Sequence, residues 1–111
     1  MNWTIKIVYP EHTTYDGLSV PREEKEFEIP FKKYETVYYV HRKNWLRNNS
    51  PYVITKCTVT GAWATNIVGV ILDSEDYVEE DRFDMLFTDR DAAIECCLKK
   101  NEHRKVKIYG E

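Results

Sequence analysis

The sequence has few cysteines, few glycines and no long apolar run. Its three cysteines are an odd number, and the adjacent pair Cys96 and Cys97 cannot readily form a disulfide with each other. A disulfide framework is therefore not expected, which favours a reducing, cytoplasmic setting. The four glycines stand alone at positions 17, 61, 69 and 110, which excludes a glycine-rich phosphate loop. No segment has the length that crosses a bilayer, and no secretion signal is expected at residues 1–8.

Aromatic side chains, in contrast, are abundant. Eight tyrosines, three tryptophans and four phenylalanines occur among 111 residues, and 42% of the chain is hydrophobic. Such a chain can bury a core without disulfides or metals, and we expect one domain spanning residues 1–111. Aromatic residues are enriched both in strands and at interfaces.

The net charge of −3 conceals three blocks of charge. Residues 37–72 contain four basic and no acidic side chains, whereas residues 73–91 contain nine acidic and two basic ones. Residues 92–111 are basic again, with five basic and three acidic side chains. These blocks become oppositely charged patches only if the fold keeps them on separate surfaces.

Alternation of apolar and polar residues predicts some of the strands, and enrichment in β-branched and aromatic residues predicts the others. Asp16-Gly17 predicts a turn or loop that can close a hairpin, and Gly61 and Gly69 fit a bulge, a turn or a close backbone approach. A short further strand is expected around Tyr77 and Val78. The predicted strands lie near residues 3–9, 25–29, 35–41, 52–60, 66–72 and 105–109.

A helix is predicted over about residues 89–101. Thr88 is the expected N-cap, and Asp91 three residues later can complete a reciprocal cap. Lys99 and Lys100 fall in the last turn, where cations oppose the helix dipole. One broad apolar face, expected to pack on the sheet, contains Ala93, Ile94, Cys96, Cys97 and Leu98.

The order of strands, helix and final strand predicts the α+β class. We expect a small, mainly antiparallel β-barrel or curved sheet of about five to six strands, with the α-helix in the C-terminal half of the chain. The barrel core would span about residues 34–109, and residues 1–33 would add an N-terminal strand extension.

Four segments, "ETVYYV", "KCTVTG", "VGVIL" and "MLFTDRDAAIECCLKK", resemble a group of small, uncharacterised bacterial and phage proteins. The resemblance covers residues 34–100. It implies a barrel of the Src-homology-3 type with a C-terminal helix, and it transfers no catalytic residues. This sequence departs from the group in its long N-terminal third and in the loop "HRKNWLRNNSP", where a specific function would reside.

The cysteines and histidines offer one conceivable metal site. Cys57, Cys96, Cys97 and His103 are suitable zinc ligands, but adjacent helical cysteines point about 100° apart and lack the usual spacing of paired ligands. We expect instead that at least one cysteine of the helix is buried as a small hydrophobe and that no metal is bound.

Enzymatic machinery is not evident in the sequence. No cysteine and histidine are spaced so that a nucleophile pair is required. The run "DSEDYVEEDRFD" lacks the sixth-position glycine of a calcium-binding loop. We therefore expect a non-enzymatic protein without catalytic residues or cofactors.

Two surfaces are candidates for partner binding, and they suggest different partners. In the first interpretation the chain occupies a partner protein, as a phage- or mobile-element-encoded inhibitor of a bacterial defence nuclease such as a CRISPR effector would. In the second, basic residues around an aromatic in residues 41–51 bind nucleic acid. Whether the protein is a monomer or a homodimer stays open. The candidate residues are Arg42, Lys43, Trp45, Arg47 and Tyr52 in the basic segment, and Glu75, Asp76, Glu79, Glu80 and Asp81 in the acidic one.

Overall fold

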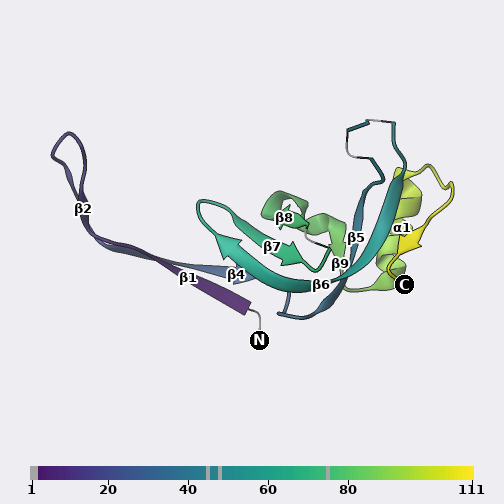
Figure 1. The fold of residues 1–111 in the computed structure, drawn as a ribbon, viewed down its shortest axis with the longest axis horizontal. Coiled ribbons are helices and arrows are strands. Elements are labelled where there is room, and N and C mark those ends of the chain that lie inside the picture. Colours follow the sequence, from purple (N-terminus) through teal and green to yellow (C-terminus); the bar gives the residue numbers. More distant parts are fainter. Residues whose placement is uncertain (1–2, 45, 48, 75) are drawn as a thin grey trace.

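The computed structural model of the protein describes residues 3–44, 46–47, 49–74 and 76–111. The molecule is elongated, with extents of 59 × 33 × 21 Å. A hairpin arm projects from a curved sheet that carries a helix on one side (Figure 1). The elements are β1 (Trp3–Tyr9), β2 (His12–Thr13), β3 (Ser19–Val20), β4 (Glu23–Ile29), β5 (Thr36–Arg42), β6 (Tyr52–Ala64), β7 (Val68–Leu72), β8 (Tyr77–Glu79), the 3-10 helix η1 (Glu80–Met85), β9 (Leu86–Phe87), α1 (Arg90–Lys100) and β10 (Ile108–Tyr109).

The main sheet confirms the predicted α+β class and the curved, mainly antiparallel sheet, but it does not close into the predicted barrel. Within the described residues, six strands form it in the order β8-β7-β6-β5-β9, with β10 pairing beside β6. All pairs are antiparallel except β10 with β6. The end strands β8 and β9 are three and two residues long and pair only with β7 and β5 in this part of the chain. The sheet is therefore curved but not closed.

The strand β5 is buried on both faces, which explains why "TVYYV" is apolar without alternation. Val37 and Tyr39 point into a cluster with Cys57 and Val59, which also takes in the base of the arm. Val40 points the other way, into a second cluster with the helix α1. The sheet thus separates two cores, and β6 contributes to both.

The arm consists of β1 and β4, joined by the short pair β2 and β3. Trp3 faces Ile29 and Ile5 faces Phe27 across the ladder, and this proximal face packs on the first core. Residues 10–22 extend beyond it (Figure 1), and Tyr15 at their tip is fully exposed. Asp16-Gly17 does close a hairpin, because Gly17 adopts φ +86° and donates its N–H to Thr14.

The two glycines in the sheet have distinct roles. The register between β6 and β7 shifts between Val59 and Gly61, which is a β-bulge, and β6 continues to Ala64 beyond the predicted end at residue 60. At Gly69 a Cβ atom would collide with the indole of Trp63. Gly69 is therefore a site of close approach, as its isolated position in a strand predicts.

The helix α1 lies one residue inside the predicted bounds at each end. Its N-cap is Asp89, whose carboxylate accepts the N–H of Asp91 at 3.0 Å, and not Thr88. Ala93 and Cys97 are fully buried against β5 and β6, which confirms that at least one helical cysteine lies in the core. Leu98 stays partly exposed.

The last strand is shorter than predicted. It covers residues 108–109 instead of 105–109, because residues 104–107 lead from the helix back to β6 before pairing begins. The described residues contain no helix whose length and apolarity would allow it to cross a membrane.

Candidate functional site

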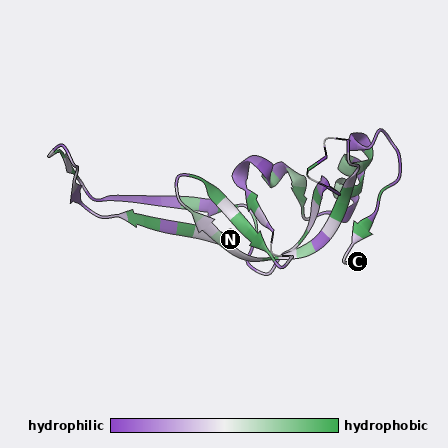
Figure 2. Ribbon diagram, turned by 45° about the horizontal axis from the view of Figure 1, so that its top comes forward, coloured by the Kyte–Doolittle hydropathy of each residue, from purple (hydrophilic) through white to green (hydrophobic). Residues whose placement is uncertain are grey.

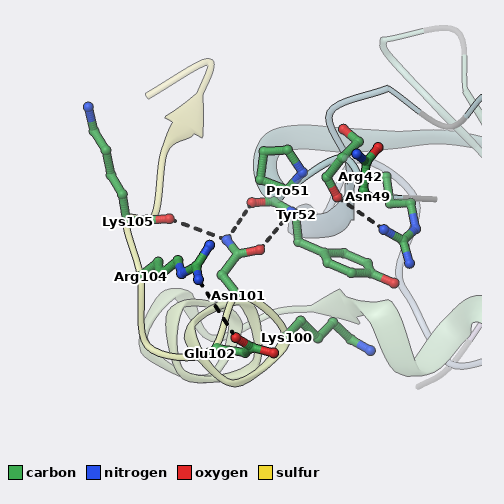
Figure 3. Close-up of a pocket in the computed structure, with 10 residues that line it drawn as sticks. Arg42, Asn49, Pro51, Tyr52, Lys100, Asn101, Glu102, Arg104 and Lys105 are labelled. Atoms are coloured by element: carbon green, nitrogen blue, oxygen red, sulfur yellow. Dashed lines mark hydrogen bonds and ion pairs between the residues drawn. The ribbon is translucent and has the colours of Figure 1, made fainter. Parts of the chain in front are cut away.

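Three segments that are distant in the sequence meet around Tyr52. They are the end of β5 with its following loop, the start of β6, and the end of α1 with the turn that follows it (Figure 3). Between them lies an open cavity of about 600 Å³. We call it the basic cavity; its lining residues are Arg42, Asn49, Ser50, Pro51, Tyr52, Lys100, Asn101, Glu102, Arg104 and Lys105.

Cations surround the Tyr52 ring. The guanidinium carbon of Arg42 lies 4.7 Å from the ring centroid, and the Lys100 ammonium lies 5.0 Å from it. Both distances are within the range of cation–π attraction. Arg42 also donates from Nη1 to the Ser50 carbonyl at 3.0 Å, which holds the guanidinium against the loop. Figure 3 shows Tyr52 reaching between these two cations.

Asn101, the C-cap of α1, fixes the cavity walls. Its Oδ1 accepts the Tyr52 N–H at 2.8 Å, and its Nδ2 donates to the Tyr52 carbonyl at 2.8 Å and to the Lys105 carbonyl at 3.2 Å. The side chain therefore joins the start of β6, the end of the helix and the returning chain. This clamp sets the position from which the cavity side chains project.

The turn after α1 directs the chain back toward Tyr52. His103 donates its N–H to the Leu98 carbonyl and Glu102 donates to Lys99, which is the hydrogen-bond pattern of a Schellman motif. Glu102 and His103 adopt φ +55° and +64°, where glycine or asparagine is usual. As a result Arg104 and Lys105 join Lys100 at the cavity.

The loop residues that the sequence suggested are only partly brought together. Arg42 and Tyr52 face the basic cavity, but Lys43 and Arg47 are not part of its lining. The loop is closed by the Lys43 N–H, which donates to the Pro51 carbonyl. Trp45, the predicted aromatic anchor, lies outside the described residues.

A second open cavity, of about 610 Å³, lies beside the edge of β5. Its lining includes Arg42 and Lys43 from the basic segment and Asp76 and Arg82 from the acidic one. The His41 ring lies against Tyr39, with centroids 4.9 Å apart, and its Nε2 is 2.7 Å from the Thr55 hydroxyl. The basic and acidic segments therefore approach one another at this cavity.

The acidic segment forms a separate exposed surface on β8 and η1. Because η1 buries none of its residues, its carboxylates project into solvent, and Figure 2 colours this stretch hydrophilic. Glu75 lies outside the described residues. We call this surface the acidic ridge; it consists of Asp76, Glu79, Glu80, Asp81 and Asp84, all exposed.

An aromatic pair borders the acidic ridge. Tyr77 is 69% exposed and packs edge-on against Trp63, with ring centroids 5.8 Å apart. Val78, the next residue of β8, is fully buried and holds the strand on the first core. Glu79, Glu80, Asp81 and Asp84 form no ion pair with any residue that the structure describes.

The cysteines do not converge. Cys57 belongs to the first core and Cys97 to the second, on opposite faces of the sheet. Burial raises the pKa of the Cys57 thiol to about 12, with Asp73 and Asp76 adding to the rise, and burial also raises the pKa of Cys97. Across residues 3–44, 46–47, 49–74 and 76–111, no three His, Cys, Asp or Glu side chains group as metal ligands would.

The sequence interpretation missed half of the basic cavity. Arg104 and Lys105 stand out in the sequence only as part of the basic excess after position 92, and Lys100 only as a cation in the last turn of the helix. Their approach to Tyr52 depends on the docking of α1 on β5 and β6, which no local pattern reveals. Comparison of the chain with protein-family models, with curated proteins and with solved structures finds no match in any of the three.

Proposed function

We propose that the protein is a non-enzymatic binding module that acts by occupying a partner protein through the acidic ridge. The observation that supports this best is the combination of carboxylates that have no ion pair in the described chain with an exposed aromatic side chain, Tyr77, which packs on the half-buried Trp63. Glu79, Glu80 and Asp81 are exposed and follow Tyr77 closely in the chain. Aromatic anchors dominate the binding energy of many protein interfaces, and surrounding charges steer the encounter.

The charge of the acidic ridge defines the chemistry of the partner. Four carboxylates without ion pairs within the described chain repel one another, and a basic surface would relieve this repulsion. A groove that normally binds nucleic acid has such a surface. The proposal is therefore that the protein competes with nucleic acid for a basic groove, as a phage- or mobile-element-encoded inhibitor of a bacterial defence nuclease would.

The ridge is held in place by buried neighbours. Val78 is fully buried, and the Leu72 N–H donates to the Asp76 carbonyl at 2.9 Å across the turn between β7 and β8. The Ser74 hydroxyl donates to the Asp76 carboxylate at 2.9 Å. Little ordering entropy would be lost on binding, because the backbone of the ridge is already fixed.

The test passes a nuclease-treated bacterial lysate over the immobilised protein and over two variants. Glu79→Gln/Glu80→Gln removes charge from the ridge, and Glu11→Gln/Glu26→Gln removes the same charge from exposed positions on the arm. A protein retained by the wild type and by the arm variant, but lost from the ridge variant, supports the proposal. Equal retention by the ridge variant contradicts it.

Once a partner is isolated, Tyr77→Ala distinguishes an anchored interface from a purely electrostatic one. We expect the substitution to weaken binding by about 2 kcal/mol, which is roughly a 30-fold increase in Kd. Glu79→Gln/Glu80→Gln should act mainly on the association rate. If Tyr77→Ala changed the Kd by less than twofold, the aromatic pair would not be part of the interface.

A further inference from the structure

The basic cavity lies at the opposite side of the sheet from the first core. It shares Arg42 and Tyr52 with the second cavity, whose lining also includes Asp76 of the acidic ridge. The described lining of the basic cavity includes four cations, Arg42, Lys100, Arg104 and Lys105, and the single carboxylate of Glu102. Glu102 lies 4.0 Å from the Arg104 guanidinium, and both side chains are more than 80% exposed. Water screens this pair strongly. With four cations and one carboxylate in its described lining, the cavity has an excess of positive charge.

Compensation of the helix dipole does not account for this charge. The end of a helix carries the equivalent of roughly half a negative charge, which one cation offsets. Lys99 and Lys100 already lie in the last turn of α1. Arg42 comes from β5, and the Schellman turn brings Arg104 and Lys105 to the cavity in addition. Within the described chain, no carboxylate lies within ion-pair distance of the Lys100 or Lys105 ammonium.

The cavity is built on fixed backbone. The Asn101 clamp joins all three segments through hydrogen bonds of 2.8 to 3.2 Å. The Arg42 guanidinium is held by the Tyr52 ring and by the Ser50 carbonyl. The Lys100 and Lys105 ammoniums have no carboxylate within ion-pair distance in the described chain, so an anionic ligand is stabilised beside them.

The arrangement indicates which anion fits. Arg42 and Lys100 both contact the Tyr52 ring, so the ring is not available as a platform for a nucleobase. Planar guanidinium groups and lysine ammoniums bind phosphate oxygens well. An open cavity of about 600 Å³ exceeds one phosphate ion and admits several linked phosphates.

We infer that the basic cavity binds the phosphodiester backbone of single-stranded nucleic acid, through Arg42, Lys100, Arg104 and Lys105. Recognition is of the backbone, because the bases have no stacking partner at Tyr52 and point away from the cations. Binding is therefore expected to depend strongly on salt and weakly on sequence.

The test measures fluorescence anisotropy of a labelled oligothymidylate of about 15 nucleotides, a length that spans typical single-strand sites. Four phosphate contacts predict a slope of log K against log salt of about −3, hence a loss of roughly 50-fold in affinity between about 50 and 200 mM KCl. Lys100→Gln and Lys105→Gln should each reduce the slope by about 0.7.

Two matched controls separate this inference from other causes. Lys33→Gln makes the same charge change outside the cavity and should leave the slope unchanged. Glu79→Gln/Glu80→Gln should bind the oligonucleotide at least as tightly as the wild type, so the outcome does not depend on the acidic ridge. Thermal unfolding of each variant verifies that it is folded.

Three outcomes would overturn the inference. The first is the absence of salt-dependent binding by the wild type, and the second is an equal slope for Lys100→Gln, Lys105→Gln and Lys33→Gln. The third is the binding of a mononucleotide or of a duplex of the same sequence as tightly as the single strand, which would assign the cavity to a different phosphate ligand.

Discussion

Removal of the Asn101 side chain tests the central structural element of the basic cavity. In Asn101→Ala the Tyr52 N–H, the Tyr52 carbonyl and the Lys105 carbonyl each lose a partner at 2.8 to 3.2 Å. Each bond contributes about 1 kcal/mol net, and the partly buried position limits replacement by water. We therefore expect a loss of about 2–3 kcal/mol in the free energy of unfolding.

The assay is urea and thermal unfolding followed by circular dichroism. For a chain of this length the loss corresponds to a fall in Tm of roughly 8–12 °C. Asn101→Asp sharpens the test, because one oxygen can still accept from Tyr52 while the other faces two carbonyl oxygens. It should destabilise the protein at least as much as alanine does.

An exposed asparagine provides the control. Asn66 lies exposed in the turn between β6 and β7, and Asn66→Ala should change the free energy of unfolding by less than about 0.5 kcal/mol. If Asn101→Ala cost as little, or if Asn101→Asp were as stable as the wild type, the clamp would not hold the three segments together.

Three further predictions concern backbone and core. Gly69→Ala should lower the free energy of unfolding by about 2 kcal/mol through overpacking against Trp63. Adding Trp63→Leu to this variant should recover part of the loss. If the losses of the two single variants simply added in the double variant, the contact between the two residues would be contradicted. Glu102→Gly should raise the free energy of unfolding by about 1 kcal/mol, because the left-handed φ of +55° is strained for glutamate; a lower Tm would refute the motif. Cys57 keeps its proton in the folded state up to a pKa of about 12, whereas the unfolded thiol ionises near 9.0. The protonated thiol therefore contributes to the free energy of unfolding fully below pH 9, and this contribution is lost as the pH rises toward 12. Between about pH 8 and pH 10, the free energy of unfolding measured by urea titration should fall by about 1 kcal/mol more for the wild type than for Cys57→Ala. Equal losses would show that the thiol is not buried.

Sequence patterns predicted those elements whose side chains face one or two apolar surfaces. The strands β1, β5 and β7 and the helix α1 lie within about two residues of their expected bounds. The N-cap is Asp89 and not the predicted Thr88. Both residues have short oxygen-bearing side chains that can cap a helix, so the sequence does not distinguish them and the backbone geometry does.

The sequence could not predict features that depend on contacts between distant segments. Gly61 suggested that β6 ends, yet β7 pairs beyond the bulge and extends the strand to Ala64. The sheet stays open at its edge strands β8 and β9, which are only three and two residues long. The charge blocks predicted that basic and acidic surfaces exist, but not that residues 100–105 complete the basic one.

The strand β6 has a consequence for how the molecule unfolds. Its 13 residues place Ile54 in the core beneath α1 and Cys57 and Val59 in the core on the other face. Neither core can lose its packing without releasing residues of the same strand, so the two should melt in one cooperative transition. Amide hydrogens in the centre of β6 should then exchange only through global unfolding, whereas those of residues 10–22 should exchange through local opening of the arm.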